Sequence, residues 1–207
     1  MPGMIHTTPF IVVDLETTGL EPRLDKIIEI AAVKVVNGKI VDEWNTLVNP
    51  DMFVPQITTD ITGITTEMLK DAPAFADVIE DYLSFMGDDS IFVAHNVDFD
   101  HAFMNEHLKA HERDILPHPY LCTFKLAKRV HPNLSRYGLG FLAESFGIEL
   151  PQAHRALHDA RATAELFIKF MSVLQNGGLK TVRDIPVIQN IGLLKNEEAN
   201  NGQISLF

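Results

Sequence analysis

Residues 10–20 read FIVVDLETTGL, and this stretch decides what the first element of the fold can be. FIVV is an apolar, β-branched run of strand length, and the following TTG is a turn signal. The predicted strand therefore ends on Asp14 and Glu16. Residues two apart in a strand point to the same face, so the sequence predicts two converging carboxylates.

Two carboxylates in an apolar setting repel each other and lose their hydration unless cations compensate them. Hard divalent ions are the natural partners of carboxylate oxygens. The pair predicts a site for Mg²⁺ or Mn²⁺. Two acids that meet by chance at a solvated strand end would give the same pattern, so further acids are needed to decide.

The segments after this strand predict a mixed α/β domain. Residues 27–36 and 40–48 are strand-like and flank Asn37-Gly38, which tolerates the positive φ angles of a tight hairpin, so an antiparallel meander of three strands is expected. Helices are expected after Thr65 and over 74–86, 98–110, 123–130, 139–146 and 156–174, with extended segments at 91–94 and 120–122.

The domain is expected to span residues 1–176, followed by a C-terminal extension and polar linker over 177–202 and a short terminal peptide over 203–207. The linker ends in KNEEANNG, which is polar and has no period. No segment has the length of a membrane span and no export signal is visible, so we expect neither insertion nor export.

Composition limits the possible functions. The chain has 207 residues and one cysteine, Cys122, so an internal disulfide and a cysteine-based zinc cluster are excluded and a cytoplasmic protein is expected. Its 28 acidic and 17 basic residues give a net charge of -11. This is the wrong sign for tight binding to nucleic acid by phosphate neutralisation alone.

A second acidic position follows the next apolar strand. The strand IFVAH runs into Asn96-Val97-Asp98, where the chain passes from strand to helix. If the two strand ends are neighbours, Asp98 joins the carboxylate pair. Asp98 could instead be a simple helix cap, and Asp100 competes with it for any metal role.

A third element combines His154 with Asp159. Five residues on a regular helix turn through about 500°, so both side chains could not share one helix face. The two side chains can reach one site if Asp159 lies on the helix and His154 lies in the loop before it. Neutral imidazole is well suited to taking a proton from water near neutral pH, so His154 is a candidate general base. His158 should point elsewhere.

Together, the segments DLETTGL, VAHNVDFDHAF and HRALHDARATAELF resemble the three motifs of the DnaQ-like 3′–5′ exonucleases, in the branch named DEDDh. The resemblance covers nearly all of residues 8–175. It is strongest to the epsilon-type proofreading subunits of bacterial DNA polymerase III and to proofreading domains built into replicative polymerases. It implies a ribonuclease H-like fold, with a five-stranded mixed sheet of three antiparallel strands followed by parallel ones, flanked by helices.

The resemblance also implies an activity and its residues. A 3′–5′ exodeoxyribonuclease of this family would use two divalent ions, Mg²⁺ or Mn²⁺, to release nucleoside 5′-monophosphates from single-stranded or frayed DNA 3′ ends in proofreading or repair. By position, the implied metal ligands are Asp14, Glu16, Asp98 and Asp159. The implied general base is His154.

Substrate contacts are implied by the same motifs. They fall on Thr17, Thr18, Gly19, Leu20, Thr62, Asn96, Phe99 and His154. Within the segment ITGI, Thr62 replaces a histidine of the epsilon subunits, and Ile57 stands where they carry an acid, so contacts at these two positions are open. Lys125, Lys128, Arg129 and Arg136 form a basic cluster that could follow phosphates or be a solvated helix face.

The terminal peptide QISLF resembles the motif by which bacterial replication proteins bind the sliding clamp. Gln203 would be the polar anchor, and Leu206 and Phe207 the apolar plug. A clamp that encircles DNA would supply the local concentration that an acidic domain does not gain from phosphate attraction. A DNA polymerase subunit is a second expected partner.

Two other functions compete with the DNA exonuclease. An exoribonuclease of the same fold is disfavoured by Thr17, because oligoribonuclease-like relatives carry Met there, and by the clamp peptide. A non-catalytic adapter between polymerase and clamp is disfavoured because all five catalytic positions are intact.

Overall fold

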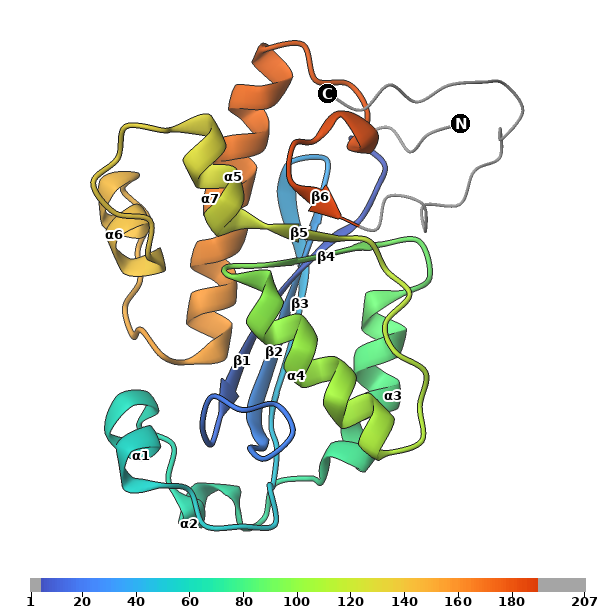
Figure 1. The fold of residues 1–207 in the computed structure, drawn as a ribbon, viewed down its shortest axis with the longest axis vertical. Coiled ribbons are helices and arrows are strands. Elements are labelled where there is room, and N and C mark those ends of the chain that lie inside the picture. Colours follow the sequence, from blue (N-terminus) through green and yellow to red (C-terminus); the bar gives the residue numbers. More distant parts are fainter. Residues whose placement is uncertain (1–4, 190–207) are drawn as a thin grey trace.

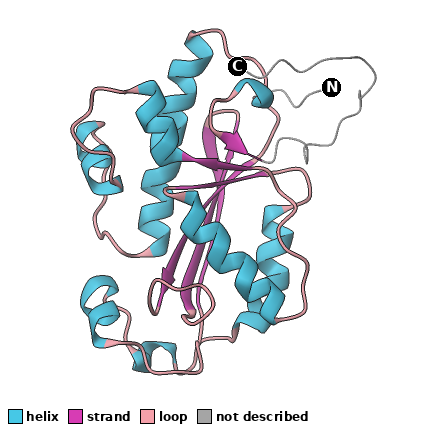
Figure 2. Cartoon of the chain, in the orientation of Figure 1, coloured by secondary structure: helices cyan, strands magenta, loops and turns pink. Residues whose placement is uncertain are grey.

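The computed structural model describes residues 5–189, which form a six-stranded mixed sheet with helices on both faces (Figures 1 and 2). The strand order is β3-β2-β1-β4-β5-β6. The strands are β1 Phe10–Thr17, β2 Ile27–Val36, β3 Lys39–Leu47, β4 Ile91–Ala94, β5 Tyr120–Cys122 and β6 Ile188–Gln189. The helices are α1 Gln56–Thr62, α2 Thr66–Leu69, α3 Phe75–Met86, α4 Val97–Ala110, α5 Thr123–Val130, α6 Leu139–Ser145 and α7 Ala156–Asn176, followed by the 3₁₀ turn Val182–Asp184.

The predicted meander is confirmed. β1 pairs antiparallel with β2, and β2 with β3, through a two-residue turn in which Asn37 and Gly38 have φ angles of 52° and 67°. β4 lies parallel to β1, and β5 parallel to β4. The sheet therefore continues from three antiparallel strands into parallel ones, as the resemblance implied.

The sheet has one strand more than the five that were expected. The two residues of β6 pair antiparallel with β5, and they come from the extension beyond α7. Val182 and Ile185, in the same extension, are buried in the core beneath α7. The described part of the extension, residues 177–189, thus packs against the domain. The rest of the linker and the peptide 203–207 lie outside the described residues.

Helix α1 was not predicted from the sequence. Its isoleucines, Ile57 and Ile61, face solvent and are 69% and 53% exposed, whereas Thr58 and Thr62 are buried. The usual pattern of apolar residues on the inner face is therefore reversed, which removes the signal that predicts an amphipathic helix.

Two cores sandwich the sheet. Along β1, Phe10 and Val12 pack in the core that includes Phe167 of α7, together with residues of α5 and α6. Ile11 and Val13 pack in the opposite core, with residues of α3 and α4. Because side chains alternate along a strand, Asp14 and Glu16 lie on the face that α7 covers.

A β-bulge shapes the end of β1. Glu16 pairs with Glu29 and Thr17 pairs with Ile27, so β2 carries one extra residue between them. The N–H of Ile27 donates to Nε2 of His107 on α4 at 3.2 Å, which leaves the Nδ1 proton to bond the Phe103 carbonyl. Burial lowers the pKa of His107 to about 4, so this imidazole stays a neutral acceptor.

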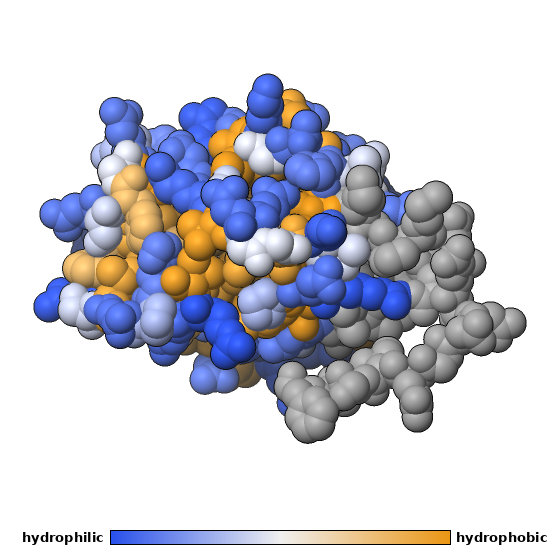
Figure 3. All heavy atoms as spheres, turned by 90° about the horizontal axis from the view of Figure 1, so that it is seen from above, coloured by the Kyte–Doolittle hydropathy of each residue, from blue (hydrophilic) through white to orange (hydrophobic). Residues whose placement is uncertain are grey.

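The length and hydropathy of the helices, and the pattern of the surface, describe the outside of the domain. Among the residues described, no helix is both long and apolar enough to cross a bilayer. On the face seen from above, apolar and hydrophilic residues are interleaved (Figure 3).

Candidate active site

Acidic side chains from three elements meet at the C-terminal end of β1. Asp14 and Glu16 come from β1, Asp100 from the first turn of α4, and Asp159 from the first turn of α7, which begins beside the end of β1 (Figure 1). Ligand atoms of Glu16, His154 and Asp159 all lie within 4.8 Å of one another. The structure thus brings these three sequence-predicted residues together.

The prediction for α4 chose the wrong aspartate. The side chain of Asp98 is 61% exposed and pairs with Lys125 at 2.9 Å. Asp100 is only 4% exposed, and its Oδ1 accepts a hydrogen bond from the backbone N–H of Leu15, between the two acids of β1. Residues two apart on a helix point about 200° apart, so only one of them can face the site. The inward acid is Asp100.

The sequence did contain a signal for this assignment. Asp100 stands three, four, seven and eight residues before Phe103, Met104, His107 and Leu108, and all of these are buried. That spacing marks one face of a helix. Asp100 therefore belongs to the inward stripe of α4, and Asp98 lies off it.

The carboxylates destabilise one another's charged forms. Burial raises the pKa of Asp14 well above its ordinary value, and the Asp100 and Asp159 carboxylates raise it further. Burial first, then the neighbouring Asp159 carboxylate, raises the pKa of Glu16 to about 8, although the Arg155 guanidinium acts in the opposite direction. Burial raises the pKa of Asp100 to about 8 and shifts that of Asp159 upward.

One atom of the cluster is open to a further partner. Oδ2 of Asp159 accepts the backbone N–H of His154 at 2.9 Å, while its Oδ1 is buried with no hydrogen-bond partner among the described residues. A buried, unpaired carboxylate oxygen amid other carboxylates suits a hard divalent cation. The donor set therefore fits a metal centre.

His154 lies in the exposed loop before α7, as expected, and its backbone has a left-handed φ of 62°. The Nδ1 of His158, the residue before Asp159, lies 3.2 Å from the Gln152 carbonyl.

The turn after Glu16 is held by Asp25. Thr18 is buried and donates its hydroxyl to Asp25 at 3.2 Å, and a side chain on Gly19 would place a Cβ 2.5 Å from the same carboxylate. The Thr17 hydroxyl donates to the Gly19 carbonyl at 2.6 Å. Leu20 is 79% exposed and free to meet a ligand.

The remaining predicted contacts differ in their accessibility. Asn96 is exposed and precedes α4 with a φ of 68°, and Phe99 is half-buried against Phe103. Thr62 is a correction, because it is buried and its hydroxyl donates to the Thr58 carbonyl. A buried, internally bonded hydroxyl is not accessible to a substrate.

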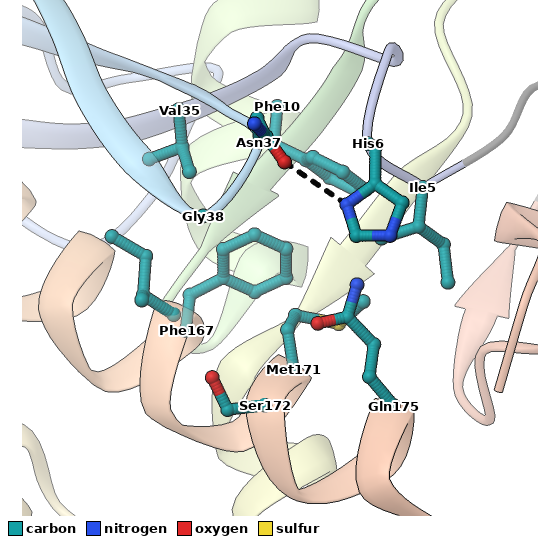
Figure 4. A pocket seen from close by; sticks show the side chains of 11 residues that line it. Ile5, His6, Phe10, Val35, Asn37, Gly38, Phe167, Met171, Ser172 and Gln175 are labelled. Atoms are coloured by element: carbon teal, nitrogen blue, oxygen red, sulfur yellow. Dashed lines mark hydrogen bonds between the residues drawn. The ribbon is translucent and has the colours of Figure 1, made fainter. Parts of the chain in front are cut away.

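A separate pocket lies at the opposite end of the sheet (Figure 4). Phe10, at the start of β1, lines it with Phe167 and Met171 of α7, and His6 is 3.0 Å from the Asn37 side chain at its rim. None of the described residues that line it is acidic. The pocket therefore offers no carboxylate ligand to a hard divalent ion, in contrast to the acidic cluster at the end of β1.

Comparison with known families identifies the domain that carries this cluster. The model of the family described as Exonuclease, RNase_T, matches residues 11–167. The chain belongs to this exonuclease family. The family resemblance stated from the three motifs is thus confirmed.

Relatives of this exonuclease include replication proteins. It is 42% identical over 165 residues to the DNA polymerase III subunit epsilon of Aquifex aeolicus, covering 80% of this chain and 81% of that protein. It is 39% identical over 181 residues to the PolC-type DNA polymerase III of Thermotoga maritima, covering 87% of this chain but only 13% of that protein. The chain thus corresponds to a small part of the PolC-type relatives.

Solved structures show the same fold. Exonuclease X in complex with 5′ overhanging duplex DNA has a TM-score of 0.68 and 31% identity, covering 85% of this chain and 96% of that one. The nuclease domain of 3′hExo, a DEDDh family member bound to rAMP, has a TM-score of 0.71 and 20% identity, covering 83% and 94%. The α/β fold predicted from the sequence is confirmed.

Substitutions of the two aspartates of α4 should affect activity to very different extents. Asp100→Asn should lower kcat by about 100-fold or more, because it removes a buried carboxylate from the site, and Asp98→Asn by less than about threefold. In chelator, Asp100→Asn should also raise the free energy of unfolding, because it relieves repulsion. Exonuclease assays and urea titrations measure both effects. A larger loss of activity in Asp98→Asn than in Asp100→Asn would instead assign the metal-ligand role to Asp98.

Metal binding should stabilise the protein in a pH-dependent way. Because the carboxyl pKa values are raised on folding, the metal-free protein loses stability as the pH rises from about 4 to the value of about 8 reached by Glu16 and Asp100. Saturating Mn²⁺ should therefore raise the melting temperature by about 5–10 °C at pH 8 and by much less at pH 5, where protons compete. Thermal melts with Mn²⁺ and with chelator test this. Equal shifts at the two pH values would contradict it.

Proposed function

We propose that this protein is a metal-dependent 3′–5′ exodeoxyribonuclease that releases nucleoside 5′-monophosphates from single-stranded or frayed DNA ends during replication proofreading or repair. The observation that carries the proposal is the group of four carboxylates, Asp14, Glu16, Asp100 and Asp159, beside an accessible His154. The similarity to DNA polymerase III epsilon and PolC-type polymerases supports the replication role.

The charge of the site supports two cations. A fifth acid, Glu29, lies on the neighbouring strand but is neutralised by an ion pair with Arg155. Four carboxyl groups then remain, and the charge they would carry when cations displace their protons equals that of two divalent ions. Mg²⁺ or Mn²⁺ bound there would supply Lewis-acid activation of water and of the departing 3′ oxygen.

The protein's own groups divide the remaining tasks. Asp14 and Glu16 on the rigid strand, with Asp100 and Asp159 at helix starts, would hold the ions. The His154 imidazole would remove the proton from the attacking water, a task suited to a neutral imidazole. Leu20 and Phe99 would contact the terminal nucleotide, and the backbone of the turn after Glu16 would approach it closely.

The activity can be tested on paired substrates. The protein should release deoxynucleoside 5′-monophosphates from a 3′-mismatched primer with Mg²⁺ or Mn²⁺, and it should fail in EDTA. Asp14→Asn should lower this rate by about 100-fold or more, because one of the carboxylates that would hold the ions becomes a neutral amide. Asp88→Asn, at an exposed aspartate, is the matched control and should leave the rate unchanged.

A matched RNA oligonucleotide distinguishes the alternatives. Faster hydrolysis of RNA than of DNA would favour the exoribonuclease. No cleavage of either substrate with any metal would favour the non-catalytic adapter.

The terminal peptide is proposed to dock on the sliding clamp through Gln203, Leu206 and Phe207, and a polymerase subunit is proposed as a further partner. The support is the sequence QISLF after a polar linker, together with the net charge of -11, which makes tethering useful.

Deleting residues 203–207 should abolish binding to the clamp of the same organism, because it removes both the anchor and the plug. Hydrolysis of a short free oligonucleotide should not change. Ser205→Ala is the matched control, and calorimetric titration of the clamp measures the affinity. Equal affinity of the full-length and shortened chains would rule out this docking mode.

A further inference from the structure

A buried ion pair adjoins the site without belonging to the proposed ligands. The Glu29 carboxylate accepts hydrogen bonds from Nε of Arg155 at 3.1 Å and from its Nη2 at 2.8 Å. It also accepts the backbone N–H of Ala156 at 2.9 Å. The Glu29 side chain is 2% exposed. Two parallel bonds between a guanidinium and a carboxylate fix the relative orientation of both groups.

This ion pair connects the sheet to the loop that carries His154. Glu29 is the partner of Glu16 in the β1–β2 register, so both side chains lie on the face that α7 covers. Arg155 directly follows His154 and is the N-cap residue of α7. A single carboxylate thereby fixes the two residues that come after His154.

His154 needs such an anchor. Its φ of 62° lies in the left-handed region, which is unfavourable for a residue with a side chain and persists only where surrounding contacts impose it. Its side chain is exposed, so no core packing holds it. Its own N–H is bonded to Asp159 on one side, and the Glu29 contacts restrain the chain on the other.

We propose that the Glu29–Arg155 ion pair fixes the backbone after His154 and thereby aims the His154 imidazole at the reacting end of the substrate. Glu29 and Arg155 are positioning residues, since neither needs to touch substrate. The inference rests on the proposed function, in which His154 is the general base.

The protein contains a matched control for this pair. Arg161 of α7 donates through Nε to Glu43 of β3 at 2.8 Å, which is again an arginine–glutamate link between the same helix and the sheet. This second pair is more exposed and lies one helical turn beyond the start of α7, away from the His154 loop. Any effect that arises simply from tying α7 to the sheet should appear at both pairs.

The first experiment measures how easily the loop that carries His154 opens, and it does not depend on nuclease activity. Trypsin cleaves after arginine, and in the wild type Arg155 is restrained by Glu29. Glu29→Gln in the full-length chain should increase cleavage after Arg155 by about tenfold or more, because local opening of the loop becomes easier. Glu43→Gln should leave that rate unchanged. Mass spectrometry identifies the cut. An unchanged rate in Glu29→Gln would overturn the proposal.

The second experiment tests whether the pair acts through His154. Arg155→Lys keeps the positive charge but loses the two-pronged geometry, so it is expected to fold even if Glu29→Gln does not. It should lower kcat by about 10- to 100-fold, because a small misplacement of a reacting group costs that much. KM and the Mn²⁺ affinity from calorimetry should stay within about twofold of wild type. Arg161→Lys should change none of these quantities.

A double-mutant cycle then decides the mechanism. In the His154→Ala background, Arg155→Lys should have almost no further effect on the residual single-turnover rate, because the group it positions is gone. An equal loss in both backgrounds would overturn the proposal, as would a parallel loss of Mn²⁺ affinity. An inactive wild type would instead remove the proposed function, and the trypsin rates would separate that failure from failure of the anchor.

Discussion

Mutual repulsion among buried carboxylates is the constraint on which the rest of this structure depends. The fold brings four acids together where water is scarce: Asp14, Glu16, Asp100 and Asp159. Burial raises the pKa of all four, and neighbouring carboxylates raise the pKa of Asp14 and Glu16 further. The folded chain tolerates this because β1, α4 and α7 are fixed by large apolar cores on both sides of the sheet. The same packing keeps the acids from moving apart.

The site combines two kinds of support. Its acids stand on a central strand and on the first turns of two helices, where regular hydrogen bonding and packing set their positions. His154 stands in a loop and depends on a few polar contacts instead. The carboxylate cluster is therefore intrinsically rigid, whereas the position of the base depends on individual bonds.

Much of this arrangement could be predicted from local patterns. The apolar run of β1, the Asn37-Gly38 turn and the period of two that joins Asp14 to Glu16 are all short-range signals. The prediction of Asp98 over Asp100 was wrong because it relied on the position of Asp98 at the strand–helix boundary. The spacing of the buried residues along α4 would have indicated Asp100.

Such local patterns do not predict contacts between residues far apart in the sequence. The bond between Glu29 and Arg155 joins residues 126 positions apart, and no periodicity encodes it. A lone acid inside the apolar run IIEIAAV was the available hint, because a buried charge needs a partner. Helix α1 escaped prediction for the opposite reason, since its exposed isoleucines contradict the rule that places apolar residues inside.

The position of α7 in the chain has a consequence for synthesis. β1, β2 and α4 all precede α7, so a growing chain contains Asp14, Glu16 and Asp100 well before His154 and Asp159 have been added. A ribosome-bound fragment that ends before residue 154 has neither the base nor the closing acid. The proposed set of catalytic residues is therefore completed only when α7 begins to be synthesised, and a product truncated before residue 154 lacks two members of it.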